Sequence, residues 1–322
     1  HEISYSMKIL GVESTAHTFG VGIVTDEGKI LSNVTDSYTT KTAGMIPDEV
    51  VDHHNAVAEK ICTKALQDAK CTWDEIDLVA YSAGPGIDPC LWAGYHKVKE
   101  WAQKYNKKLV GVNHCAAHLS IGKIYNKLND PCYLYVSGVN TQTIVFEEGK
   151  YRVLGETIDI GLGNMLDKFG RIIGLGFPAG PTIEKLAKKC KYVEIPYVVN
   201  GMDVSFSGIL TKVQQLYEQK NVSKEDLCFS IQETCFAMLT EVVERAMAHT
   251  GKQELLLVGG VGANTRFCEM LHIMCSERAA KFYKVPMDLA GDQGAMIAWE
   301  GFLRKDESGD VEVKPHWRVD EV

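Results

Sequence analysis

Two histidines, His114 and His118, are separated by four positions in the segment Asn113-His114-Cys115-Ala116-Ala117-His118. On a helix this spacing places both imidazoles on one face with converging ring nitrogens, which is half of a metal site. A chain with 10 histidines contains roughly 0.3 such pairs by chance, so an ordinary helical pair is the competing interpretation. A zincin protease has a glutamate after the first histidine to activate water, whereas this chain has Cys115, which disfavours peptide hydrolysis.

Two further carboxylates lie at predicted turns. Glu13 lies in the polar turn after the apolar run at residues 9–12, and an exposed turn acid is the alternative. Asp292 begins the last predicted helix, where an N-cap is the default interpretation. His53 and His54 are interpreted as an exposed or core-edge pair rather than as ligands.

Glycine-rich turns indicate a place for an anion or a nucleotide. Residues 259–264 (Gly-Gly-Val-Gly-Ala-Asn) follow a predicted strand and begin a helix, so their amides could face a phosphate or adenosine, although an ordinary turn is equally typical. The chain has no GxxxxGK[ST] segment and this turn is not GxGxxG, which disfavours the P-loop and Rossmann classes. Four charged residues flank the Pro/Gly turn at 177–181 and could hold a ribose or phosphate, or form solvated helix faces: Asp167, Lys168, Arg171 and Glu184.

The elements that must position these residues occur twice in the same order. Period-2 patterns and turn residues predict strands at 9–12, 19–25, 29–34, 77–81 and 108–112, and helices at 47–69, 91–106 and from 113. The order begins again at residue 132, with strands at 133–136, 142–147, 151–157, 254–258 and 281–285 and helices at 162–173, 181–189, 227–249, 264–280 and 292–304. We predict an α/β fold of two βββαβαβα halves. This is the layout of the actin/hexokinase/heat-shock-protein ATPase (ASKHA) superfamily, which binds a nucleotide in a central cleft.

Length and composition agree with a globular protein of this size. The 322 residues are 45% hydrophobic and 24% charged, which excludes disordered and fibrous classes. A net charge of −8 argues against unaided nucleic-acid binding. Ten cysteines without a CxxC pair predict buried thiols, and short apolar runs predict no membrane span and a cytoplasmic location. We predict domains at 7–128 plus 292–322 and at 129–291, with residues 1–6 as a tag or short extension.

Eight motifs stand in an order that resembles one family. They are residues 13–18 (Glu-Ser-Thr-Ala-His-Thr), Gly84-Pro85-Gly86, Asn113-His114 with His118, residues 135–142 (Tyr-Val-Ser-Gly-Val-Asn-Thr-Gln), Gly180-Pro181 with Ile183-Glu184, residues 205–208 (Ser-Phe-Ser-Gly), Gly259-Gly260-Val261 with Asn264, and Gly291-Asp292 with Gly294-Ala295. The chain resembles the universal tRNA adenosine threonylcarbamoyltransferases over nearly all of residues 7–304. It is most similar to the archaeal and eukaryotic branch, the catalytic subunit of the KEOPS complex.

The resemblance implies a set of site residues. One Fe or Zn ion would be bound by His114, His118, Tyr135 and Asp292, and Glu13 or His17 would accept a proton. A bound ATP, AMP or threonylcarbamoyl-AMP, with Mg²⁺ as a further candidate ion, would contact Tyr135, Ser137, Gly138, Val139, Asp167, Gly180, Glu184 and Asn264. Two residues depart from the family pattern, because Val139 and Ala179 stand where the family usually has glycine. Each adds a side chain where backbone is expected to approach the nucleotide.

The resemblance also implies the reaction and its partners. The threonylcarbamoyl group would pass from its adenylate to the N6 amine of the adenosine beside the anticodon of ANN-decoding tRNAs, with KEOPS-type helper subunits that include a small protein kinase or ATPase. Two lysine-rich stretches could contact tRNA, or be solvated helix faces: Lys97, Lys99, Lys104, Lys107 and Lys108, and Lys185, Lys188, Lys189 and Lys191. The alternatives are an ASKHA kinase or ATPase, a metalloprotease of the O-sialoglycoprotein endopeptidase type, and a non-catalytic scaffold.

Overall fold

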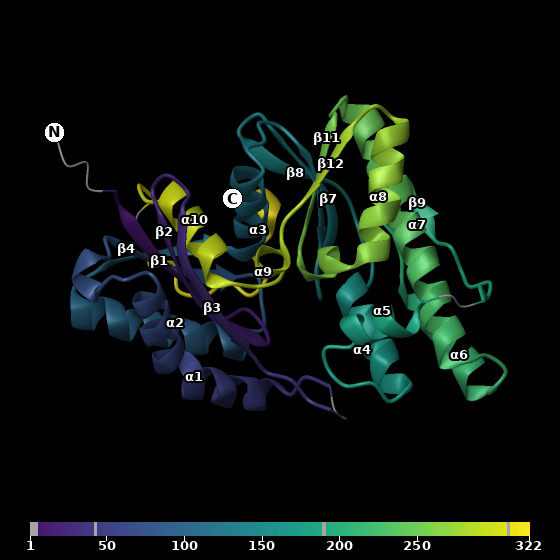
Figure 1. The fold of residues 1–322 in the computed structure, drawn as a ribbon, viewed down its shortest axis with the longest axis horizontal. Coiled ribbons are helices and arrows are strands. Elements are labelled where there is room, and N and C mark those ends of the chain that lie inside the picture. The colour runs from purple at the N-terminus through teal and green to yellow at the C-terminus, as the bar shows by residue number, and fades with distance from the viewer. Residues whose placement is uncertain (1–5, 42–43, 189–190, 308–309) are drawn as a thin grey trace. The chain divides into compact units, whose positions relative to one another are not determined.

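The computed structural model describes residues 6–41, 44–188, 191–307 and 310–322 (Figure 1). Their contacts divide them into two compact units. The first unit takes in the described parts of 1–38, 45–127 and 292–322, and the second those of 39–44 and 128–291. This division assigns residues 39–44 and Leu128 to the second unit, whereas the sequence-based boundaries place them in the first. Most of the expected tag, residues 1–5, and one expected tRNA contact, Lys189, lie outside the described residues.

The first unit is built on a five-stranded sheet in the order β3-β2-β1-β4-β5. Its strands are β1 (Lys8–Glu13), β2 (Thr18–Thr25), β3 (Ile30–Ser37), β4 (Leu78–Gly84) and β5 (Lys108–Asn113). Its helices are α1 (Pro47–Asp68), η1 (Trp73–Glu75), α2 (Asp88–Tyr105), α3 (His114–Tyr125), α10 (Gly294–Leu303) and η3 (Val319–Glu321). Strands β1 to β3 form an antiparallel meander, and β4 and β5 add to β1 in parallel.

Different helices cover the two faces of this sheet. Side chains of β1 point alternately to one face and the other, so they show which helix packs on each face. Leu10 and Val12 are buried in the core that also contains residues of α1 and α2. Gly11 points to the opposite face, where a Cβ atom would lie 2.2 Å from the backbone nitrogen of Ala298 on α10. Only glycine permits this close approach, so the position fixes α10 directly on the strands. The start of α10 lies against Gly20, the partner of Glu13 in the sheet, so Asp292, two residues before the helix, is held near the end of the sheet that carries Glu13.

The second unit repeats the plan with the strand order β12-β11-β6-β7-β8. Its strands are β6 (Cys132–Val136), β7 (Thr141–Glu147), β8 (Lys150–Glu156), β11 (Glu254–Val258) and β12 (Lys281–Lys284), with a short hairpin of β9 (Val199–Asn200) and β10 (Asp203–Val204). Its helices are α4 (Leu162–Ile172), α5 (Gly180–Leu186), α6 (Ser207–Glu218), α7 (Lys224–Thr250), η2 (Gly260–Ala263), α8 (Thr265–Glu277) and α9 (Met287–Ala290). The meander and the two parallel additions occur in the same order as in the first unit.

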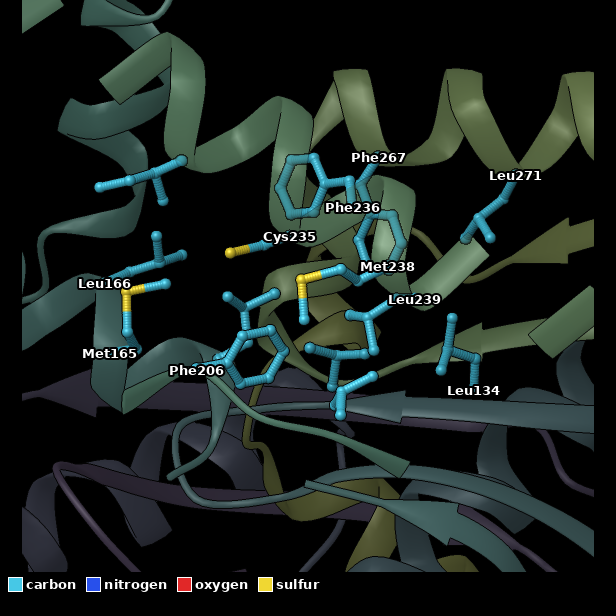
Figure 2. Close-up of a cluster of buried hydrophobic side chains, with 14 of the residues drawn as sticks. Leu134, Met165, Leu166, Phe206, Cys235, Phe236, Met238, Leu239, Phe267 and Leu271 are labelled. Carbon is cyan, nitrogen blue, oxygen red and sulfur yellow. The ribbon is translucent and has the colours of Figure 1, made fainter. Parts of the chain in front are cut away.

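An apolar core joins the second sheet to its helices. Figure 2 shows Leu134 of β6 among side chains from α4, α7 and α8. The rings of Phe236 on α7 and Phe267 on α8 are stacked, with centroids 4.5 Å apart and an interplanar angle of 3°. Both rings are fully buried, so this contact holds the start of α8 at a fixed place beside α7.

The predicted duplicated ASKHA fold is confirmed, and the differences are local. The sequence analysis missed α6, α9 and the β9/β10 hairpin, which are short or lack a long apolar period. Cys228 and Cys235 lie on α7, and the nine cysteines among the described residues are buried and free, as predicted. No helix in the described part of the chain is both long and apolar enough to cross a lipid bilayer.

Candidate metal centre and nucleotide-binding turns

Helix α3 presents the predicted histidine pair. Asn113 caps the helix, and its side-chain oxygen accepts a hydrogen bond from the amide of Ala116 at 3.0 Å. His114 is therefore the first residue of the helix and His118 lies one turn later. Their ring centroids are 4.8 Å apart and the rings are nearly perpendicular, at 84°. Both side chains are buried, so the local helix geometry predicted from the sequence is present.

Asp292 lies opposite both imidazoles. Its Oδ1 atom is 3.2 Å from Nε2 of His114 and 3.1 Å from Nε2 of His118. The default interpretation of Asp292 as an N-cap is wrong, because Gln293 caps α10 and accepts a hydrogen bond from the amide of Met296 at 2.9 Å. Asp292 is therefore available to the histidines. One ligand atom from each of the three residues lies within 4.8 Å of the others, which forms a candidate metal site.

Glu13 supports His114 from behind. Its Oε2 atom accepts a hydrogen bond from Nδ1 of His114 at 2.7 Å, and its Oε1 atom accepts one from the amide of Thr15 at 2.6 Å. Glu13 is fully buried at the end of β1. A carboxylate on the second nitrogen of a histidine fixes the ring and its tautomer, and leaves Nε2 for a metal. Since both oxygens already accept hydrogen bonds, this geometry favours a positioning role over the proton-acceptor role that the sequence predicted.

The pKa values of the three residues in this cluster shift in different directions. Burial opposes a charge on His114, but Glu13 and Asp292 on either side raise its pKa well above the usual value. Burial is also the main reason that the pKa of His118 is lowered, so this ring is neutral. Burial disfavours ionised Asp292, yet the two histidines hold its pKa well below the usual range. A cation bound here would replace the proton on Nε2 of His114.

The donor set fits a transition metal. Two imidazole nitrogens and one carboxylate, with a second carboxylate orienting His114, are typical of Zn²⁺ and Fe sites. The fourth predicted ligand, Tyr135, is fully buried near the end of β6 in the second unit. Its place in the ligand set stays a prediction. His17 is half-buried in the turn after β1, and its charge contributes to lowering the pKa of His54.

The turn between β6 and β7 offers backbone rather than side chains. The amide of Ser137 donates to the carbonyl of Asn140 at 2.8 Å, which closes the turn. Helix α4 docks on it, because the amides of Gly163 and Asn164 donate to the carbonyls of Ser137 and Gly138 at 3.0 and 2.8 Å. The amides of Gly138 and Val139 donate to no group among the described residues. Two adjacent open amides suit an anion such as phosphate.

The other predicted nucleotide contacts gather at the start of α8. Asn264 caps this helix and accepts a hydrogen bond from the amide of Phe267, while Glu184 on α5 accepts one from the amide of Thr265 at 2.8 Å. Two of the first amides of α8 are therefore occupied, which disfavours the expected anion site at this helix terminus. Asp167 on α4 accepts a hydrogen bond from the amide of Ala179 at 2.8 Å.

A family model for tRNA N6-adenosine threonylcarbamoyltransferase matches residues 29–299, which is most of the chain. The chain belongs to this family. The tRNA N6-adenosine threonylcarbamoyltransferase of Thermococcus kodakarensis is 51% identical over 98% of both chains. A probable bifunctional tRNA threonylcarbamoyladenosine biosynthesis protein of Methanobrevibacter smithii is 46% identical over 97% of this chain and 59% of its own. These relatives support the archaeal branch of the threonylcarbamoyltransferase family.

A solved structure supports the fold. Component A of the Acidaminococcus fermentans (R)-2-hydroxyglutaryl-CoA dehydratase is 13% identical and has a TM-score of 0.57 over 93% of this chain and 99% of its own. At this identity the likeness concerns the ASKHA fold alone.

The two departures from the family's glycine pattern leave the turns intact. Ala179 is 1% exposed, and its methyl group packs over Gly170, where a Cβ atom would lie only 2.3 Å away. This methyl group therefore points into the core and not toward a ligand. Val139 has a negative φ and is 64% exposed, so the turn accepts its side chain without strain. The backbone amide of Val139 remains accessible.

Three supporting residues were missed by the sequence analysis. Gln232 on α7 accepts a hydrogen bond from Nδ2 of Asn264 at 2.7 Å, and Thr15 lies 3.4 Å from Nδ1 of His114. Asp159 accepts hydrogen bonds from the side chain of Ser205 and from the amides of Phe206 and Ser207, which explains the Ser-Phe-Ser-Gly motif as a helix start. Burial opposes ionisation of Asp159, but these hydrogen bonds hold its pKa below the usual range. Thr15 lies within the motif at residues 13–18, but no local pattern shows the partners of these three residues, which are distant in sequence.

The two predicted lysine stretches differ in their surroundings. In the first unit, Lys97 lies 3.3 Å from both Glu59 and Glu100, and Lys99 lies 3.5 Å from Asp310. In the second unit, Lys185 is exposed and forms no ion pair among the described residues. Lys104, Lys107 and Lys108 of the first stretch likewise form no ion pair among the described residues, so each stretch offers some uncompensated positive charge.

Proposed function

We propose that this chain transfers the threonylcarbamoyl group from threonylcarbamoyl-AMP to the N6 amine of the adenosine beside the anticodon of ANN-decoding tRNAs. The observation that carries the proposal is the buried His114/His118/Asp292 cluster, backed by Glu13, in a chain that the comparisons place in the threonylcarbamoyltransferase family. A sugar kinase or chaperone ATPase of the same fold has no use for this donor set.

One Fe or Zn ion would be bound by His114, His118 and Asp292, with Tyr135 as the fourth ligand. When bound, the ion supplies Lewis acidity and a template for the acyl group. Glu13 keeps His114 in the tautomer that presents Nε2.

The second unit would hold the adenylate. The open amides of Gly138 and Val139 suit its phosphate, with Ser137 in the same turn and Gly180 at the start of α5. Glu184 and Asn264, which meet at the start of α8, would lie beside the ribose or purine, and Asp167 would stabilise the neighbouring turn at Ala179. ATP or AMP would occupy the same contacts.

The transfer reaction requires little proton transfer by the protein. The attacking exocyclic amine is neutral and weakly nucleophilic, and AMP is the leaving group, so orientation and charge stabilisation contribute most of the rate. The amine loses a proton as its bond to the carbamoyl carbon forms. Because Glu13 is occupied by two donors, His17 is the remaining predicted acceptor for this proton.

The protease alternative lacks a free base. Residue 115 is a cysteine, and the buried Glu13 is engaged by His114 and Thr15 rather than available to activate a water. Peptide hydrolysis by the HExxH mechanism is therefore disfavoured.

Helper subunits would supply tRNA binding. A net charge of −8 repels a polyanion, and two lysines of the first unit, Lys97 and Lys99, are compensated by acids. We infer that the chain works as the catalytic subunit of a KEOPS-type complex that includes a small protein kinase or ATPase, in the cytoplasm. Lys185 and Lys188 on the second unit would contribute to the tRNA contact.

Reconstitution tests this proposal. The chain and its helper subunits are incubated with labelled threonine, bicarbonate, ATP, the adenylate-forming enzyme and transcript tRNA, and label in tRNA is counted. We expect label that requires this chain and falls to background with His118→Ala, while the exposed control His249→Ala transfers normally. Label that does not depend on this chain, or that survives His118→Ala, would contradict the transferase function.

A further inference from the structure

A chain of four groups connects the molecular surface to the turn after β1. Oδ1 of Asp36 on β3 lies 2.6 Å from Nε2 of His53, whose Nδ1 lies 2.9 Å from Nδ1 of His54. Nε2 of His54 lies 2.7 Å from the carbonyl oxygen of Ala16. His54 is 1% exposed, so no water replaces these contacts. This is the histidine pair on α1 that the sequence predicts to be an exposed or core-edge pair rather than ligands.

The acceptors at the two ends fix every proton in this chain. A carbonyl oxygen only accepts, so Nε2 of His54 carries hydrogen and donates to Ala16. Burial, together with the charges of His53 and His17, lowers the pKa of His54 to about 4, so the ring is neutral and its Nδ1 is an acceptor. Nδ1 of His53 must therefore donate. Since Nε2 of His53 faces the Asp36 carboxylate and also donates, His53 carries both protons and a positive charge.

The far end of the chain lies in the turn that carries the catalytic candidates. Residues 14–17 are each held by a different element: the amide of Ser14 donates to Ser82 of β4, and the carbonyl of Thr15 accepts from the amide of Ile87 at 2.8 Å. The carbonyl of His17 accepts from the amide of Tyr38 at 2.9 Å. His54 provides the anchor at Ala16, directly between Thr15, which contacts His114 and Glu13, and His17.

We infer that His53 and His54 are positioning residues for the transfer reaction: through the hydrogen bond from His54 to Ala16, supported by His53 and Asp36, they hold the turn at residues 14–17 in its active conformation. When one of the side chains in this chain of groups is replaced by an apolar one, at least one of its hydrogen bonds is lost and the Ala16 anchor loosens. The inference rests on the proposed function for its effect on rate, but the proton arrangement itself does not.

The charged and titratable groups around His53 come from three elements. Asp36 belongs to β3, His54 and Glu49 belong to α1, and Tyr38 follows β3, with its ring 6.4 Å from that of His53. The hydroxyl of Tyr38 donates to Oε2 of Glu49 at 2.5 Å, so this carboxylate is already occupied. His17 adds its charge on the side of His54. Asp36 is therefore the carboxylate that compensates His53.

Substitutions separate the links of the chain. His54→Leu removes the anchor, whereas His54→Gln retains an N–H group close to the position of Nε2. We expect kcat to fall about tenfold with His54→Leu and to recover most of the loss with His54→Gln, with little change in KM for the adenylate. His272→Leu, an exposed histidine of the second unit, is the matched control. Equal kcat for His54→Leu and the parent, in chains with unchanged thermal unfolding, overturns the inference.

Substitutions of Asp36 test the support of His53. An asparagine amide can donate to Nε2 of His53, so the chain of hydrogen bonds persists in Asp36→Asn, whereas Asp36→Leu offers no polar atom to this nitrogen. We expect kcat to fall with Asp36→Leu and to stay near that of the parent with Asp36→Asn. Equal kcat for Asp36→Leu and the parent contradicts the inference.

Long-range ¹H–¹⁵N spectra of the histidine rings give a readout that does not depend on activity. They should show hydrogen only on Nε2 of His54 and on both nitrogens of His53. Hydrogen on Nδ1 of His54 would overturn the proton arrangement even in a fully active enzyme. Conversely, an inactive parent chain with the expected spectra would refute the proposed function and leave the arrangement intact.

Discussion

The two units share one topology but place different chemistry at the same position. In both, the first strand of the meander ends in a four-residue turn, at residues 14–17 in the first unit and 137–140 in the second. Buried side chains surround the first turn. His54 and Ser82 form hydrogen bonds with its backbone, and Glu13 accepts a hydrogen bond from His114 beside it. The second turn is held by backbone hydrogen bonds and by the hydroxyl of Ser137, which accepts from the amide of Asn140 at 3.2 Å, and the amides of Gly138 and Val139 stay open. The repeated topology thus presents two equivalent turns. The first is surrounded by side chains, and the second offers backbone amides.

This difference explains how each turn tolerates change. A side-chain site depends on the identity of each donor, because a lost partner leaves a buried polar group unsatisfied at a cost of about 1–3 kcal/mol. A backbone site depends on shape, which is why Val139 and Ala179 can replace glycines without disturbing it. Substitutions of side chains should therefore have large effects in the first unit and small effects in the second.

Removal of a metal ligand should have the largest effect. His118→Ala or Asp292→Ala removes one of three donors from a buried site, and we expect loss of stoichiometric metal and a fall in transfer rate of at least about 100-fold, since metal stabilisation contributes several kcal/mol. Elemental analysis of the purified chains measures the metal directly. Metal content equal to the parent in both variants would show that the cluster is only structural.

Acid should destabilise the first unit through His54. Its pKa of about 4 lies below the unfolded value near 6.5, so the neutral ring stabilises the fold fully above pH 6.5, and this contribution is lost as the pH falls toward 4. The shift corresponds to about 3 kcal/mol. Urea unfolding between pH 7 and 4 measures it, and His54→Gln, which cannot be protonated, should show a shallower decline. A parallel decline in both chains would assign the acid sensitivity to other groups.

Much of this comparison could be predicted from the sequence, and the remainder could not for physical reasons. The order of elements along the chain, the histidine pair and the glycine turns follow from local patterns, since each depends on neighbours within a few residues. Glu13 as the partner of His114, and Asp36 as the partner of His53, depend on pairing between segments that the chain brings together only in the fold. Local sequence alone predicts Asp292 as a cap, because it does not distinguish Asp292 from Gln293, which takes that role, and only the family resemblance predicts it as a metal ligand.

Metal affinity should rise with pH through His114. Glu13 and Asp292 raise the pKa of this ring, so a cation must displace its Nε2 proton, and affinity should increase up to about tenfold per pH unit until His114 titrates. Glu13→Gln removes one of the two carboxylates and should reduce this slope. Titration of the metal-free chain with Zn²⁺ at several pH values measures it. The same slope in both chains would mean that Glu13 does not control the proton on His114.

A methyl group at Gly180 should have the smallest effect and tests the backbone character of the second unit. No atom lies within 4 Å of a Cβ atom built at Gly180 or at Gly208, so Gly180→Ala and the matched control Gly208→Ala should both fold normally. If phosphate approaches the start of α5, the added methyl group displaces it and lowers affinity for AMP by about fivefold, or about 1 kcal/mol, while Gly208→Ala binds as the parent does. Calorimetric titration of AMP into the three chains measures this. Equal affinities would move the phosphate away from α5 and leave the amides of Gly138 and Val139 as its site, whereas equal weakening in both variants would point to a general loss of helix geometry.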